Sequence, residues 1–124
     1  MKAYWTEKNQ RQIGSAAELD SVIDDVRALG EPTILFVEQD DGTTLALGLG
    51  APESVLAYVD TSGASYHSVG DLERGGILRF WCRDQLDDFL AEMAVPVAVA
   101  TEAAHEFCTN GGIKPSNLRW EADW

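Results

Sequence analysis

Between residues 33 and 83 the sequence is a series of short strand-like segments separated by turns, and this pattern constrains the fold more than any other feature. The segments occupy 33–39, 43–50, 54–60, 65–70 and 77–83. The connections between them, such as Asp40-Asp41-Gly42, are too short for crossover helices, which favours antiparallel pairing. In the second segment, apolar residues alternate with others at Leu45, Leu47 and Leu49, as expected of a strand with one buried face.

Two helices flank this strand region. The first is predicted over 15–29, where Ser15 and Glu18 form a capping-box pattern and Gly30 provides a stop signal. Its apolar residues fall on one face at helical spacing: Leu19, Val22, Ile23, Val26 and Leu29. The second helix is predicted within 97–112, with a shared face made by Ala100, Ala103, Ala104 and Phe107.

Two segments complete the fold prediction. Residues 84–96 are compatible with a loop containing one helical turn or with a short strand reaching Val95-Pro96, and both readings stay open. Leu118 and Trp120 alternate with charged neighbours and indicate a last edge strand. The pattern as a whole predicts an α+β fold: one curved antiparallel sheet of about five or six strands with two helices packed on it. At 124 residues we expect a single domain, 1–124.

The charge balance restricts the partners. Nine basic and twenty-one acidic residues give a net charge of −12. Such a surface repels nucleic-acid phosphates and anionic membranes, so direct binding to either is disfavoured, whereas a basic protein would be attracted. The N-terminal residues lack the apolar core of a signal peptide, and no apolar stretch reaches the ~20 residues needed to span a bilayer. Cys82 and Cys108 then fit reduced thiols in a cytoplasmic protein.

The polar segment 58–71 contains the residue types of a hydrolytic triad. His67 is flanked by Ser65 and Ser68 and bracketed by Asp60 and Asp71. Residues two apart on one strand share a face and do not converge as a triad requires, so His67 is interpreted as a contact residue rather than a base. Phosphate-binding, nucleophile-elbow and metal-ligand spacings are also missing from the sequence. We therefore predict no catalytic, cofactor or metal site.

Three stretches carry a resemblance to a known family. They are the strand-turn-strand "LAYVDTSGASYHSVGD", the strand "GGILRFWCR", and "VPVAVATEAAHEFCTNGGIKPSNLRW", in which a Val-Pro precedes an alanine-rich helix and a final Leu-x-Trp. In this order the chain, from about Ser15 to Trp120, resembles the Imm-one immunity proteins of bacterial polymorphic toxin systems. The resemblance implies a protein without chemistry of its own that binds and blocks a cognate toxin, often a nucleic-acid deaminase.

The family has no fixed contact motif, so partner-binding candidates come from the residues themselves. A polar, partly aromatic set and a second acidic set are predicted to meet the toxin: Asp60, Tyr66, His67, Asp71 and Glu73, and Asp84, Asp87 and Asp88. Core packing is the default expectation for Tyr58, Phe80, Trp81 and Trp120. Two other functions remain open: a small hydrolase or ligand-binding enzyme using the His67 region, and a non-enzymatic adaptor domain.

Overall fold

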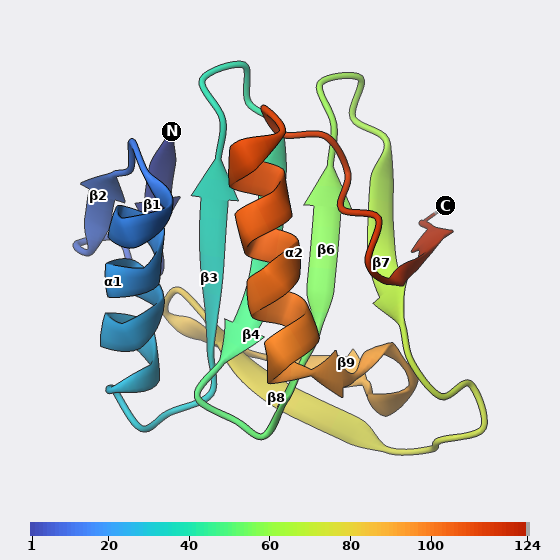
Figure 1. Cartoon of the computed structure of the whole chain (residues 1–124). Coiled ribbons are helices and arrows are strands. Elements are labelled where there is room, and N and C mark those ends of the chain that lie inside the picture. The colour runs from blue at the N-terminus through green and yellow to red at the C-terminus, as the bar shows by residue number, and fades with distance from the viewer. Residues whose placement is uncertain (124) are drawn as a thin grey trace.

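Two helices pack side by side on one face of an extended β-sheet, and a two-stranded ribbon crosses the other face (Figure 1). The structure, a computed structural model, describes residues 1–123. Its helices are α1 (Ala16–Arg27), the short 3-10 helix η1 (Ala91–Met93) and α2 (Val97–Thr109). Its strands are β1 (Lys2–Tyr4), β2 (Gln10–Gln12), β3 (Thr33–Glu38), β4 (Thr44–Leu49), β5 (Glu53–Ser54), β6 (Leu56–Val59), β7 (Ser65–Val69), β8 (Ile77–Cys82), β9 (Gln85–Leu90), β10 (Val95–Pro96) and β11 (Arg119–Ala122).

The main sheet is antiparallel along its whole path. Its strands lie in the order β11-β7-β6-β4-β3-β1-β2, and β8 and β9 form an antiparallel ribbon that joins β3. That junction is a single parallel bridge between Thr33 and Trp81, supported by the Trp81 N–H, which donates to the Pro32 carbonyl at 2.8 Å. The predicted α+β class is confirmed. The sheet has nine strands within residues 1–123, more than expected, because β1, β2 and β9 extend it.

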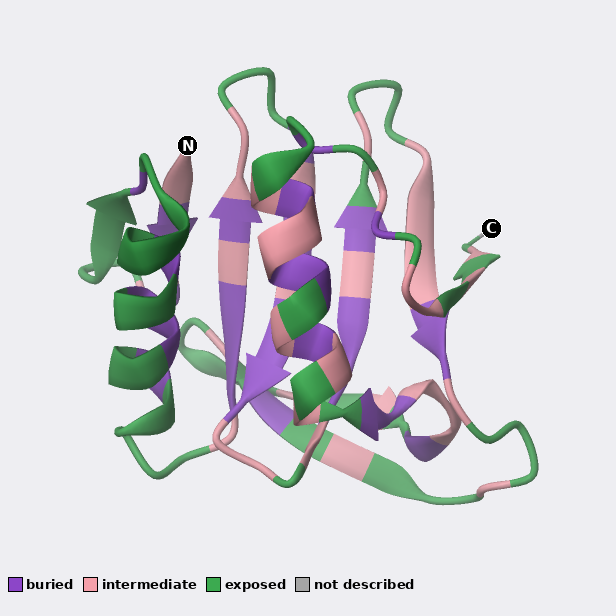
Figure 2. Ribbon diagram, viewed as in Figure 1, coloured by how far each residue is buried: buried purple, intermediate pink, exposed green. Residues whose placement is uncertain are grey.

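The main core lies between the sheet and the helices. Leu45, Leu47 and Leu49 of β4 are buried on this side, as the alternation predicts. The buried face of α2 is mostly alanine, which allows the helix to approach β4 closely. Figure 2 shows the buried residues on the side of α2 that faces the sheet. Leu35 and Val37 of β3 complete the layer, so the sheet buries one face almost continuously.

Helix α1 follows its sequence signals except at its end. The Ser15 hydroxyl accepts a hydrogen bond from the Glu18 N–H at 3.2 Å, which is the predicted cap. Gly30 has φ of +71° and ends the helical path. The expectation that Leu29 belongs to the buried face is wrong, since its side chain is 51% exposed. The helix ends at Arg27, and the terminal turn carries Leu29 away from the helical face.

The sequence left segment 84–96 undecided between a loop with one helical turn and a short strand at Val95-Pro96. The structure contains the turn and the short strand, and also a longer strand that neither reading included. Residues Gln85–Leu90 form β9, which pairs with β8; η1 supplies the helical turn, and Val95–Pro96 form a short strand paired with β5. Acidic and apolar residues mix in β9 without a clean alternation, and this hid the strand from sequence analysis.

A second, smaller core attaches the β8–β9 ribbon to the helix-free face of the sheet. It consists of Ile34, Val55 and Phe80, with Leu78 and Phe89 packed against it. The Phe80 ring lies directly over Gly48 of β4: a Cβ built on Gly48 would come within 2.5 Å of a ring carbon. Glycine at this position therefore allows the ribbon to lie close to the sheet.

We expect Gly48→Ala to destabilise the protein by about 1–3 kcal/mol, because the added methyl group overpacks against a buried ring. Urea denaturation of the variant and the wild type measures this difference. Gly75→Ala is the matched control, since a Cβ there meets nothing within 4 Å, and its free energy of unfolding should stay within ~0.5 kcal/mol of wild type. Equal stabilities for the two variants would show that the ribbon does not depend on this contact.

Candidate functional site

The β8–β9 ribbon divides its side chains strictly between two sides. Phe80 is buried, and Leu78 and Cys82 face inward with it toward the small core. Because successive strand residues point to opposite sides, Ile77 and Trp81 face solvent. Figure 2 shows this alternation along β8, where exposed residues separate more buried ones.

Strand β9 completes an exposed surface on the outer side of the ribbon. Its register pairs Ile77 with Leu90, Arg79 with Asp88, and Trp81 with Leu86. We call the surface made by these six residues the hairpin face. Its four large apolar side chains are exposed by the following fractions: Ile77 54%, Trp81 37%, Leu86 47% and Leu90 57%. The ion pair between Arg79 Nε and Asp88 Oδ1, 2.8 Å apart, lies between the two apolar rungs.

A hollow of about 320 Å³ adjoins the Trp81 end of the hairpin face. Its lining includes Trp81, Leu29, Glu31 and Asp84. The half-exposed Leu29 therefore lies on the wall of this hollow. The carboxylates of Glu31 and Asp84 and the Arg83 guanidinium border this apolar wall, so the hollow can accept a side chain that is apolar along its length and charged or polar at its tip.

The predicted acidic residues of the ribbon occupy three different positions. Asp84 is exposed in the β8–β9 turn, and Asp88 belongs to the hairpin face. Asp87 lies on the inner side, where its carboxylate accepts a hydrogen bond from Gln85 Nε2 at 2.7 Å and lies near Cys82. Asp84 is thus exposed to a partner on the outer side. Asp88 faces the same side but is paired with Arg79, and Asp87 is partly occupied within the fold.

The other predicted contact residues lie elsewhere on the sheet. Asp60 caps the β6–β7 turn, where its Oδ1 accepts from the Ser62 and Ala64 N–H groups at 2.9 and 3.1 Å. The pKa of its carboxyl is lowered, chiefly by the Ser62 hydroxyl and then by these backbone groups. Tyr66 points toward the helices and lies under the Lys114 ammonium, 3.9 Å from the ring centroid. Both residues therefore have a role within the fold.

Asp71 and Glu73 lie in the exposed loop between β7 and β8. Asp71 Oδ1 accepts from the Glu73 N–H at 3.0 Å and shapes this loop. The β6–β7 turn and the ribbon lie at opposite ends of the sheet (Figure 1). The predicted residues therefore form two groups: Asp60, Tyr66 and His67 near one end, and the loop and ribbon residues near the other.

His67 has an acidic partner that the sequence reading did not identify. Its Nδ1 contacts Asp123 Oδ1, and the Ser65 hydroxyl donates to Asp123 Oδ2 at 2.6 Å. In a hydrolytic triad the histidine lies between the acid and the serine, whereas here the aspartate lies between the other two. Ser68 is buried, donates to the Met93 carbonyl at 2.7 Å and accepts from the Leu56 N–H. Neither serine is placed as a nucleophile activated by His67.

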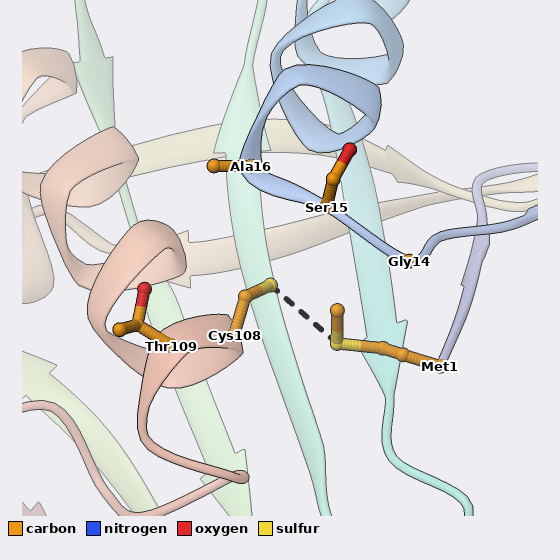
Figure 3. A pocket seen from close by; sticks show the side chains of 6 residues that line it. All are labelled: Met1, Gly14, Ser15, Ala16, Cys108 and Thr109. Carbon is orange, nitrogen blue, oxygen red and sulfur yellow. Dashed lines mark hydrogen bonds between the residues drawn. The ribbon is translucent and has the colours of Figure 1, made fainter.

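The two thiols are also poorly suited to chemistry. Burial raises the pKa of Cys82 to about 12, with a further contribution from Asp87, and raises that of Cys108 to about 11. Figure 3 shows Cys108 beside a pocket of about 210 Å³ between the start of α1 and the end of α2, with its thiol donating to Met1 Sδ at 3.4 Å. Both cysteines are therefore neutral packed side chains near pH 7.

Two further kinds of site are missing from the described residues. Within 1–123, no three His, Cys, Asp or Glu side chains converge as metal ligands would. No helix in this range is long and apolar enough to cross a bilayer.

Sequence analysis missed the apolar part of the hairpin face. The expectation that Trp81 is a core residue is wrong, whereas Tyr58 and Phe80 are buried as expected and Trp120 is half-buried. The alternation of Ile77, Arg79 and Trp81 was visible, but the side facing solvent could not be assigned without β9. Leu86 and Leu90 belonged to the segment 84–96, for which two readings stayed open and neither included a strand at 85–90.

We expect both thiols to react slowly with iodoacetamide in the folded protein. The alkylation rate should still be rising steeply with pH at pH 9, with no plateau, because the thiolate is the reacting species and both pKa values are raised well above the ordinary ~8.5. In 8 M urea the same thiols should titrate near 8.5. Cys82→Ser and Cys108→Ser variants separate the two rates, and a native midpoint as low as the ~8.5 expected in urea, for either thiol, would contradict this prediction.

Asp123 should contribute a small, pH-dependent stabilisation. The Ser65 hydroxyl, and then His67, lower the pKa of its carboxyl below the unfolded value of ~3.9. Its stabilisation is therefore fully present above pH ~4 and is lost as pH falls through the folded pKa. Because the side chain is 40% exposed, we expect Asp123→Asn to cost less than about 1 kcal/mol at pH 7. Urea unfolding should show this difference shrinking by pH 3; a constant difference would contradict the assignment.

A comparison with protein-family models identifies the family of the chain. The model described as Immunity protein Imm1 matches residues 7–122, which is nearly the whole chain. A search of curated proteins found no match. Immunity proteins of this family bind and neutralise a cognate toxin and are normally not enzymes. The chain belongs to the Imm1 (Imm-one) family of immunity proteins.

Proposed function

We propose that this immunity protein neutralises a nucleic-acid deaminase toxin by covering the groove through which the toxin binds its substrate. The observation that carries the proposal is the net charge of −12 on a chain of 124 residues. A domain that acts on DNA or RNA needs a basic surface to hold phosphates. An acidic protein can occupy that surface by placing carboxylates where phosphates would lie.

The distribution of carboxylates supports this role. Asp71, Glu73, Asp84 and Asp88 are exposed along the β7–β8 loop and the ribbon. Asp84 has no regular secondary structure to maintain and lies on the rim of the hollow beside Trp81. Long-range attraction between such a surface and a basic groove speeds encounter and guides orientation.

The proposal places the protein in the cytoplasm of the producing cell, where a toxin with a nucleic-acid target would do harm. Co-expression with the toxin domain encoded beside its gene tests this directly. Cells carrying both should grow, and cells carrying the toxin domain alone should not. In vitro, the purified chain should abolish deamination of a single-stranded substrate at equimolar ratio. If the toxin domain alone does not deaminate the substrate, or if it still deaminates it fully after the chain is added, the proposal is overturned for that toxin.

The affinity for the toxin domain should fall with salt. Between 50 and 500 mM NaCl we expect Kd to rise at least about tenfold, mainly through a slower association rate, because screening shortens the range of attraction between opposite charges. Surface plasmon resonance at four salt concentrations measures both rates. The double variant Asp84→Asn/Asp88→Asn should show a weaker salt dependence. Glu102→Gln is a control for the loss of a carboxylate elsewhere, because Glu102 is exposed on α2, across the sheet from the ribbon, and it should behave like wild type. Association that is insensitive to salt would contradict an electrostatic role.

A further inference from the structure

The hairpin face combines features that an ordinary solvated surface lacks. Single exposed apolar side chains are normal, but contiguous ones mark contact surfaces. Here two apolar pairs, Ile77 with Leu90 and Trp81 with Leu86, lie on one side of one ribbon. The two pairs lie four residue steps apart along β8, which is roughly 13 Å. The aliphatic part of Arg79 lies between them and extends the apolar surface.

The arrangement is also typical of an interface centre. Tryptophan and arginine are over-represented among side chains that dominate binding energy, and such side chains are surrounded by a polar rim. Trp81 stands beside the hollow lined by Leu29, so a partner side chain can pack against the indole and be enclosed on a second side. Asp84, Glu31 and Arg83 supply a charged rim at this end.

Charge decides between two occupants of this surface. A second copy of the chain would bring another −12 against the first, and two such surfaces repel each other. A basic domain would gain from the same charge. The edge of β9 that does not pair with β8 carries no further strand within the described residues, and charged side chains such as Asp88 discourage edge-to-edge pairing between copies.

We propose that the hairpin face is the principal toxin-binding surface, with Trp81 and Leu86 as its anchor and Ile77 and Leu90 as its second apolar contact. This rests on the proposed function, because the occupant is the same basic toxin domain. The proposal adds that apolar burial at the ribbon supplies most of the affinity, while the acidic residues around it set the rate of encounter.

The test replaces outward-facing leucines without changing charge. Leu86→Gln/Leu90→Gln should raise Kd for the toxin domain encoded beside the gene at least about 30-fold, measured by isothermal titration calorimetry at 150 mM NaCl. Trp81→Gln tests the other strand and should raise Kd at least about tenfold. Ile113→Gln is the control: this residue is 67% exposed in the loop after α2, at the end of the sheet away from the ribbon, and its change should leave Kd within about threefold.

The leucine variants should fold, because both side chains are about half exposed, and circular dichroism melts should confirm this for them and for Trp81→Gln, whose side chain is 37% exposed. If wild type binds and the ribbon variants bind equally well, the proposed surface is wrong although the proposed function stands. If wild type itself fails to bind the toxin domain, the proposed function fails first. A free chain that sediments as a dimer and becomes monomeric in Leu86→Gln/Leu90→Gln would assign the hairpin face to self-association and also overturn the proposal.

Discussion

The packing of Phe80 onto Gly48 determines how the rest of the outer surface is arranged. The Phe80 ring lies against the backbone of β4, and only a residue without a side chain permits that distance. Phe89 meets the same ring edge-on, with centroids 5.8 Å apart. Once these inner residues are buried, the twofold periodicity of a strand places Ile77, Trp81 and their β9 partners in solvent. The Phe80–Gly48 contact in the small core therefore determines which ribbon residues face solvent and form the hairpin face.

Acidity and apolar exposure support each other in this molecule. Exposed apolar ribbons invite association between identical chains, and a charge of −12 opposes that association over a distance of about a Debye length, ~8 Å at physiological salt. The same charge attracts a basic partner. The protein can therefore expose an apolar surface and still favour basic partners over acidic ones. This combination suits an immunity protein, which must bind its toxin quickly without associating with itself.

The strongest local patterns gave correct predictions, and the errors arose where tertiary context decides. The leucines of β4, the cap at Ser15 and the alanine face of α2 followed from periodicity and capping rules, and so did the α+β class. Strand β9 was missed because its inner residues are buried only where the β8–β9 ribbon packs against the sheet, and local sequence does not show that contact. Trp81 was assigned to the core because large aromatic residues usually are. Asp123, which contacts His67 from 56 residues away, had no signal in local sequence. The predicted contact residues remain predictions, and the structure places only some of them beside the hairpin face.

The central claim is that toxin binding covers the outer side of the β8–β9 ribbon. Hydrogen–deuterium exchange of the chain, free and bound to its toxin domain, tests this most directly because it reports every backbone segment at once. The account predicts slower exchange on binding in residues 77–90, and little change in the β6–β7 turn at 60–64 or in the loop at 110–116. Slower exchange confined to the β6–β7 turn or to the helices, with residues 77–90 unchanged, would contradict it.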